Sequence, residues 1–377
     1  MTDKANLQRS RLPELFAFFL QLGLTAFGGP AAHIALMEQG AVSRQWMSRE
    51  EFLDLVGGCN LLPGPSSTQV AMALGYRRGR VSGLVIAGLC FILPASLATL
   101  ALAWAYVHFG RLPQVAGFLY GTKPVIVAIV AQAILRLGWS AVKRWTLAFL
   151  GVACLVAAAG GLPPFVILLW SGVFAMGLVP RHREGAWFSF GVPLTTGGAA
   201  ASAVGLGSIA LLFLKLGVVV FGSGYVLLAF LKADLVDRLH WISVQQLLDA
   251  VTAGQMTPGP VFATSTFIGY LLHGWAGAAV ATIAVFLPSF FLAGMVGALA
   301  GRIRQSKMAG AFIDGVNVAA VALMAQIAFV LGRASLIDAP AWIIAVTSAV
   351  LLLWLRVNAT WLILGGAALG ILLQVLH

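Results

Sequence analysis

Long runs of apolar residues, free of Asp, Glu, Lys and Arg, alternate along the chain with short polar stretches. Four of these runs cover residues 81–107, 145–180, 273–301 and 357–376. Each run meets or exceeds the roughly 20 residues that a helix needs to cross a bilayer. The pattern predicts an all-α polytopic membrane protein, because a spanning helix satisfies its own backbone hydrogen bonds in lipid.

The composition agrees with this class and narrows the choice of partners. Of the 377 residues, 60% are hydrophobic and 9% are charged, whereas a soluble domain has about 25% charged residues. The net charge of +11 comes from Lys and Arg clusters between apolar runs, as at residues 77–80 and 302–307. Cytoplasmic loops show this bias, so we expect the lipid bilayer as a partner and no nucleic acid. The three cysteines lack the spacing of metal ligands, and we expect neither a metal nor a cofactor.

The second half of the chain repeats the first at a spacing of about 194 residues. A fixed period of this kind indicates a duplication. We predict a first repeat over residues 12–180, a linker over 181–204 and a second repeat over 205–377. The residues that match in order are Phe27 and Phe221, Trp46 and Trp241, Asp54 and Asp249, Asn60 and Gln255, Pro63-Gly64-Pro65 and Pro258-Gly259-Pro260, Pro94 and Pro288, and Gly121 and Gly315.

The charges of the loops predict that the two repeats have opposite orientations in the membrane. Residues 77–80 contain three arginines, whereas the corresponding residues 272–275 contain no Lys or Arg. One loop later the bias reverses, because residues 302–307 are basic and the first repeat has only Arg111. Corresponding loops on opposite faces are typical of inverted repeats. We expect about 10–13 transmembrane helices. Inversion requires an odd number of crossings before the second repeat, so either 145–180 crosses once, an early segment is re-entrant, or the linker crosses.

Each repeat contains a break that a membrane helix would ordinarily avoid. Pro63-Gly64-Pro65 and Pro258-Gly259-Pro260 lie in apolar sequence and are followed by hydroxyl and amide residues. A proline inside a helix costs about 3 kcal/mol, and the freed backbone groups are tolerated only within protein or beside a water-filled cavity. One such break indicates a packing kink as readily as a site. Two breaks at matched positions favour a transport site near the membrane midplane.

The residues around the breaks favour an anion as the ligand. A helix restarts after each break, and a helix N-terminus offers free N–H groups and about half a positive charge. Hydroxyl and amide side chains can donate to an oxyanion, although each hydroxyl could instead bond only its own helix backbone. The candidate substrate-binding residues are Gly28, Gly29, Asn60, Pro63, Gly64, Pro65, Ser66, Ser67, Thr68, Gln69, Lys123, Gly222, Ser223, Gln255, Pro258, Gly259, Pro260 and Thr264.

Ionisable residues within the apolar runs are few, and each is a functional candidate. Lys123, whose counterpart is Asn317, could neutralise a bound anion or could extend to the membrane surface. Asp54 and Asp249 precede the two breaks and could transfer protons. We favour a structural role for both, as helix caps or as partners of loop arginines.

These motifs resemble the chromate ion transporter family, in its long, two-domain bacterial form. The resemblance lies in FGGPAAHIALM (27–37) and NLLPGPSSTQVAMALGYRRGRVSG (60–83), with the counterparts FGSGYVLL (221–228) and QMTPGPVFATSTFIGY (255–270). It implies a multi-pass protein of the bacterial cytoplasmic membrane that exports chromate and gives chromate resistance. It also implies sensitivity to sulfate, which like chromate is a tetrahedral dianion.

The energy source and several alternatives stay open at this point. No Gly-x-x-x-x-Gly-Lys-Ser/Thr loop is present, so we expect secondary transport, as a uniport or with proton entry. An enzyme is not expected, because the six histidines are scattered singly and no His-Glu-x-x-His or Gly-x-Ser-x-Gly motif occurs. The alternatives are a carrier for sulfate or another oxyanion and, less favoured, a passive anion channel. Whether the chain forms a homodimer also stays open.

Overall fold

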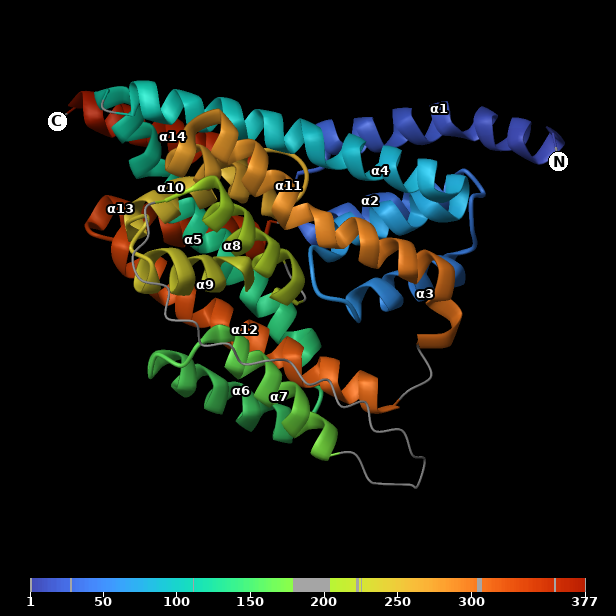
Figure 1. Cartoon of the computed structure of the whole chain (residues 1–377). Helices are drawn as coiled ribbons and strands as arrows, with labels where there is room; N and C mark the ends of the chain where they lie inside the picture. Colours follow the sequence, from blue (N-terminus) through green and yellow to red (C-terminus); the bar gives the residue numbers. More distant parts are fainter. Residues whose placement is uncertain are drawn as a thin grey trace.

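A computed structural model gives the arrangement of the helices (Figure 1). It describes the whole chain except Met1, Gly28, Arg111, 179–203, 222–223, Tyr225, 304–306, Arg356 and His377. Within these residues the named elements are all helical, which confirms the prediction of an all-α protein. The first repeat contributes α1 (Thr2–Thr25), α2 (Pro30–Ser43), α3 (Arg49–Asn60), α4 (Ser66–Phe109), α5 (Pro113–Ala141), α6 (Trp145–Ala159) and α7 (Pro164–Gly177).

The second repeat follows the same order of elements. Its helices are α8 (Leu206–Val219), α9 (Val226–Leu231) with a π-helical extension (Lys232–Arg238), α10 (Val244–Met256), a 3-10 turn (Val261–Ala263) with α11 (Thr264–Ile303), α12 (Lys307–Ser335), α13 (Ala339–Leu353) and α14 (Ala359–Leu376). The elements α1 to α7 therefore correspond one by one to α8 to α14. The prediction of two homologous repeats is confirmed.

Matched capping residues fix where α3 and α10 begin. The Ser48 hydroxyl accepts from the Glu51 N–H at 3.1 Å, and the Glu51 carboxylate accepts from the Ser48 N–H at 2.8 Å. Ser243 and Gln246 make the same two bonds at the start of α10. Such a capping box satisfies two N–H groups that the first turn leaves open. The hydrogen bond from the Ser48 N–H also lowers the pKa of the Glu51 carboxyl.

The two longest helices are each folded back into a helical hairpin. In α4 the backbone leaves helical geometry at Gly79 and Arg80, where φ of Arg80 is 54°. Gly75 and Gly83 then lie so close that a Cβ on either would overlap the carbonyl of the other. In a continuous helix these two residues would be about 12 Å apart along the axis. The turn therefore leaves a short arm over residues 66–78 and a long arm over residues 81–109.

The second repeat has the same hairpin at the corresponding positions. The backbone of α11 departs from helical geometry at His273 and Gly274, and Gly269 lies against Gly277. The sequence predicted loops at these two places, but not that the two arms would pack directly against each other. The sharp turn falls in the RRGR loop of the first repeat and in its uncharged counterpart in the second.

The long arms of α4 and α11 lie side by side and run in opposite directions. Gly88 lies against the Phe290 ring, whereas Leu84, one turn earlier in α4, lies against Gly294, one turn later in α11. Figure 1 shows the N- and C-termini at opposite ends of the molecule. Because α4 and α11 are corresponding helices that both have the length and apolarity of a membrane span, their opposed directions mean that the repeats are inverted, as predicted.

The rest of each repeat packs largely against the other repeat. The first helices stay within their own half, α1 against α4 and α8 against α11. In contrast, α5 packs against α13 and α14, while α12 packs against α6 and α7. The close approach of α5 to α14 depends on Gly117, Gly121, Gly366 and Gly370, where added side chains would overlap the facing backbone. The two halves therefore share one interleaved core.

Apolar helices fall into two length classes. Ser66–Phe109, Val115–Ala141, Val261–Val296 and Gly310–Ser335 are long and apolar enough to cross a membrane, and six shorter apolar helices accompany them. The run over residues 145–180 contains two helices, α6 and α7, with 15 and 14 residues. A helix of this length spans about 22 Å, which is less than the roughly 30 Å hydrocarbon core.

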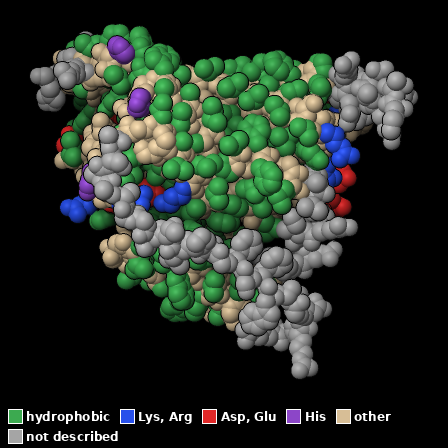
Figure 2. All heavy atoms as spheres, in the orientation of Figure 1, with side chains coloured by type: hydrophobic (Ala, Val, Ile, Leu, Met, Phe, Trp, Pro, Cys, Tyr) green, Lys and Arg blue, Asp and Glu red, His purple; other side chains and the backbone are tan. Residues whose placement is uncertain are grey.

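The molecular surface matches a protein embedded in lipid. Hydrophobic side chains cover most of the face shown in Figure 2, and the charged side chains visible there gather toward its edges. Large apolar side chains such as Trp139, Trp354 and Trp361 are well exposed. A soluble monomer rarely exposes apolar patches of more than a few hundred Å², so this surface indicates contact with the bilayer.

Candidate anion site where the helix breaks cross

The two Pro-Gly-Pro breaks are joined to the opposite repeat by reciprocal hydrogen bonds. The Gly64 N–H donates to the Val220 carbonyl at 2.6 Å, and the Gly259 N–H donates to the Ala26 carbonyl at 2.9 Å. Val220 and Ala26 are corresponding residues, directly after α8 and α1. Pro63 also forms an isolated antiparallel bridge with Phe221. We call this meeting point, made by residues 26, 63–65, 220–221 and 258–260, the crossing.

Both central glycines have a backbone conformation that other residues rarely adopt. The φ angles are 114° at Gly64 and 96° at Gly259. A Cβ on Gly64 would come within 3.0 Å of the Ser289 hydroxyl, and one on Gly259 within 2.8 Å of the Ala95 Cβ. Ala95 and Ser289 are again corresponding residues. The glycines allow the two repeats to approach, and their N–H groups bind carbonyls of the other repeat.

Helix N-termini open onto the crossing without side-chain caps. The short arm of α4 begins at Ser66 directly after Pro65, which supplies no side-chain cap. The helix α2 begins at Pro30 after Gly29, which has φ of 81° and likewise supplies no cap. In the second repeat a 3-10 turn leads from Pro260 into α11. The uncapped N–H groups and the positive ends of the helix dipoles favour an anion here.

Buried polar side chains without hydrogen-bond partners gather on the helices that lead from the crossing. They belong to the short arms of α4 and α11, to the long arms facing them, and to the end of α10. A buried donor or acceptor left unpaired costs about 1–3 kcal/mol, so several on neighbouring helices indicate a place for polar ligands. The unpaired atoms are Thr68 Oγ1, Gln69 Oε1, Ser96 Oγ, Gln255 Nε2, Thr264 Oγ1, Ser265 Oγ and Ser289 Oγ.

The remaining polar groups near the breaks have partners. Gln69 Nε2 donates to the Pro63 carbonyl, which ties the short arm of α4 to its own break. His33 is fully buried, and its Nε2 lies 3.1 Å from the same Ala26 carbonyl that Gly259 binds. The His33 Nδ1 has no partner among the described residues. Gln69 and His33 therefore brace the crossing in the first repeat.

A buried ion pair links the repeats beside the crossing. Lys123 Nζ lies 2.8 Å from Asp249 Oδ1, and the two side chains are 10% and 3% exposed. The Tyr106 hydroxyl donates to Asp249 Oδ2 at 2.8 Å. Both Lys123 and Asp249 are candidates from the sequence, but their pairing with each other was missed. The signal for it was available, because the scarce charges inside a membrane protein usually pair.

The other sequence candidates are placed as follows. Ser67, Thr68, Gln69 and Thr264 are buried beside the breaks, whereas Asn60 is exposed at the end of α3 and its counterpart Gln255 is half-buried. Ser66 is buried and has an interaction partner. The predictions for Gly28, Gly222 and Ser223 concern positions outside the described residues.

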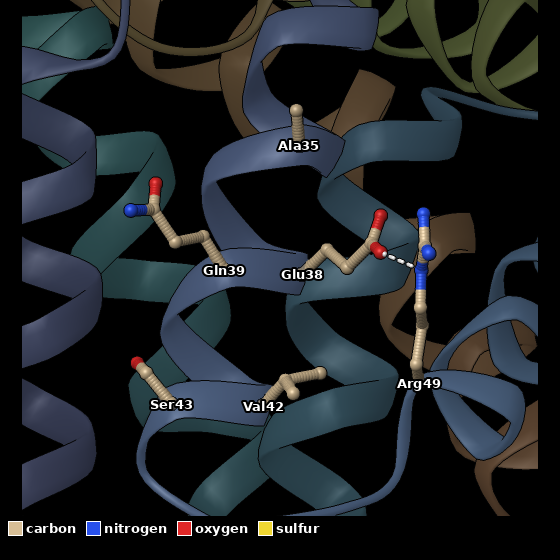
Figure 3. Close-up of a pocket in the computed structure, with 6 residues that line it drawn as sticks. All are labelled: Ala35, Glu38, Gln39, Val42, Ser43 and Arg49. Carbon is tan, nitrogen blue, oxygen red and sulfur yellow. Dashed lines mark hydrogen bonds and ion pairs between the residues drawn. The ribbon is translucent and has the colours of Figure 1, made fainter.

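A separate surface pocket lies on the outer side of α2. Its lining includes Glu38, Gln39 and Arg49, and Figure 3 shows the Glu38 carboxylate directed at the Arg49 guanidinium. Their ion pair of 2.7 Å is on the surface, with Arg49 74% exposed. The arginine is already neutralised by a carboxylate, so this pocket is a poorer anion site than the crossing.

The architecture defines a class of protein. Inverted repeats whose interrupted helices meet at the centre of the molecule are typical of secondary membrane transporters. The sequence profile described as "Chromate transporter" matches residues 13–176 and 207–371, which lie one in each repeat. The chain belongs to the chromate transporter family.

Curated relatives agree with this membership. The chain is 32% identical over 368 residues to the chromate transport protein of Cupriavidus metallidurans, covering 95% of this chain and 92% of the relative. It is 33% identical over 350 residues to the probable chromate transport protein of Synechococcus elongatus, covering 90% and 89%. A chromate transport protein of Pseudomonas aeruginosa is 33% identical over 332 residues, covering 83% and 79%. No solved structure matches the chain.

Proposed function

We propose that the protein is a secondary transporter that exports chromate from the cytoplasm and binds it at the crossing. The observation that supports this site is the group of buried, unpaired hydroxyl and amide side chains on helices whose N-termini open at the two breaks. The printed names of the relatives supply chromate as the ion. The bacterial cytoplasmic membrane is the location this function requires.

The chemistry of the crossing suits a tetrahedral dianion. Its oxygens can accept hydrogen bonds from hydroxyls such as those of Thr68, Thr264 and Ser289, and from N–H groups in the first turns, which have no N-cap side chain. Among the residues that the structure describes, no lysine or arginine ion pair lies at the crossing itself, so binding there depends on dipoles. A site of this kind holds an anion loosely enough to release it, which a carrier requires. Sulfate has the same shape and charge, so we expect it to compete.

The membrane potential gives the export its direction. Moving one charge through a potential of 100 mV is worth about 2.3 kcal/mol. A dianion leaving a cell with a negative interior therefore gains about twice that amount per 100 mV. Uniport is then sufficient to drive export, and proton entry would add to the gradient without being necessary.

The test is uptake of labelled chromate into inside-out membrane vesicles that contain the protein. We expect saturable uptake that excess sulfate inhibits and that falls when the membrane potential is collapsed. A fall on collapse of the pH gradient alone would instead indicate proton coupling. Flux that does not saturate would indicate a channel.

Two results would contradict the proposal that the protein exports chromate. Sulfate uptake much faster than chromate uptake would make the protein a sulfate carrier for which chromate is incidental. The absence of any chromate uptake above vesicles without the protein, with the protein shown to be in the membrane, would exclude chromate as the substrate.

A further inference from the structure

The two repeats are not packed equally around the crossing. The helix α10 packs against α11 of its own repeat and against α4 and α5 of the other, and it also touches α12, whereas its counterpart α3 packs against α2, α4 and α11. In Figure 1, α10 lies among the helices near α5, and α3 lies at the opposite edge of the molecule. Within the described residues, α3 thus has no contact with α12 comparable to that of α10 with α5. The α10 side therefore has a contact between the repeats, that of α10 with α5, which the described residues of the α3 side do not match.

Individual positions show the same difference. Asp249 of α10 is 3% exposed, while the corresponding Asp54 of α3 is half-buried. Thr252 is fully buried. At the corresponding Gly57, an added Cβ would meet no atom within 4 Å. Matched residues of the two repeats therefore differ in how accessible they are.

The contact that closes the α10 side is the group of Lys123, Asp249 and Tyr106, which we call the lysine triad. Lys123 is on α5 and Tyr106 on α4, both of the first repeat, and Asp249 is on α10 of the second repeat. The Thr99 hydroxyl lies 3.1 Å from the Thr257 hydroxyl, next to the second break. Tyr106 follows Thr99 by seven residues, so the triad lies about 10 Å from the break along α4.

The sequence provides no equal contact on the α3 side. The positions that correspond to Lys123 and Tyr106 hold Asn317 and Ala300. Asp54 is present there, but neither the lysine nor the tyrosine of the triad has a counterpart. If both repeats had kept the same residues at these positions, the contacts that close the two ends would be equal.

We propose that the lysine triad is the gate that closes one end of the transport pathway, and that the opposite end has a weaker gate because Asn317 replaces the lysine. Inverted repeats transport by rocking against each other, so that contacts between repeats form on one side as they separate on the other. The triad joins two helices of one repeat to a helix of the other and must separate when that end opens. Parting a buried ion pair leaves two uncompensated charges unless water enters, which biases the resting protein toward closure at this end. This inference rests on the proposed transport function.

The gate can be tested without any substrate, by the accessibility of introduced thiols. Thr252→Cys and Gly57→Cys place reporters at corresponding positions beside the two ends. The three native cysteines are buried, and the labelling of the parent protein is measured and subtracted. A membrane-impermeant maleimide is applied to sealed vesicles of both orientations. We expect the reporter at position 57 to react at one face and the reporter at 252 to be protected.

The decisive variants exchange the two counterpart residues. Lys123→Asn gives the first repeat the residue of the second, and we expect labelling at position 252 to rise by at least about tenfold. Asn317→Lys gives the second repeat a lysine at the position that corresponds to Lys123, where it can pair with Asp54 only when that end closes, and we expect labelling at position 57 to fall. Tyr106→Phe keeps the ring and removes one hydrogen bond, so it should raise labelling at 252 by a smaller factor.

Two results would contradict the proposal that the lysine triad is a gate. One is equal labelling of the two reporters in the otherwise unchanged protein. The other is unchanged labelling at position 252 with Lys123→Asn. If Lys123→Asn does not reach the membrane, labelling at position 252 with Tyr106→Phe decides instead. The charge exchange Lys123→Asp with Asp249→Lys is a second alternative, and it should again protect position 252 from labelling. Chromate uptake in the same vesicles tests the proposed function separately. If chromate uptake is absent but the labelling pattern is as expected, chromate is excluded as the substrate and the proposal of a gate still stands.

Discussion

Gly64 and Gly259 show how a single residue can stabilise a break in a membrane helix. Each glycine has a positive φ and donates its N–H to the other repeat. The N–H groups of the two glycines are therefore satisfied inside the protein, as the absence of water in lipid demands. The sequence predicted that these glycines belong to a transport site near the membrane midplane. It could not show that their own N–H groups bind carbonyls, because those bonds join Gly64 to Val220 and Gly259 to Ala26, which lie far apart along the chain.

We expect Gly64→Val and Gly259→Val each to reduce chromate uptake by at least tenfold while the protein remains in the membrane. A β-branched residue at positive φ costs about 1–3 kcal/mol, and its side chain would push Ser289 or Ala95 away. Uptake into inside-out vesicles, normalised to the amount of protein, is the measurement.

Gly365→Val is the matched control for these two variants. Gly365 lies on α14, and a Cβ there would meet no atom within 4 Å, so uptake should be unchanged. Full activity of both Gly64→Val and Gly259→Val would mean that the crossing is not part of the transport pathway.

At the scale of elements, the turns within α4 and α11 divide each of these long helices into a short arm and a long arm. A straight helix of 44 residues would extend about 66 Å, roughly twice the thickness of the hydrocarbon core. Folding at Gly79 and Arg80 leaves one long arm of spanning length and directs the short arm back to the crossing. The sequence predicted the spanning run, the break and the loop in which the turn lies, but not the close packing of the two arms. Hydropathy does not report how tightly two helices approach each other.

We expect Gly75→Val to destabilise the protein by about 2 kcal/mol or more, because the two arms of α4 touch at Gly75 and Gly83 and overpacking forces the backbone apart. The midpoint of thermal unfolding in detergent should fall by several degrees. Gly177→Val, where an added Cβ meets no atom within 4 Å, should leave the midpoint unchanged. Equal midpoints for the two variants would mean that the arms are not held together by this contact.

On the scale of the whole molecule, the repeats are interleaved and do not form separate domains. The helices α5 and α12 each pack against the last two helices of the opposite repeat. The duplication and its inversion could be predicted, since motif order and loop charge report them directly. The interleaving could not, because the apolar faces of these helices look the same whether they contact their own repeat, the other repeat or lipid.

We expect neither repeat to be stable alone, but the two to assemble when expressed together as separate chains divided within residues 178–205. Each half alone would expose the glycine-lined faces of α5 or α14 and would leave one break without its carbonyl partner. Co-purification of the two halves through a tag on one of them, together with chromate uptake, is the measurement. A single half that purifies as a monodisperse, helical species would contradict this expectation.

The reciprocal bonds of Gly64 to Val220 and of Gly259 to Ala26 also bear on how such a chain could arise. A protein consisting of one repeat could complete its break only by pairing with a copy of itself inserted upside down. Its loops would have to carry almost no charge bias, so that both insertions occurred in the same membrane. Once two copies were fused, each could acquire the loop charges that fix its own orientation, and residues such as Lys123 could change on one side without changing on the other.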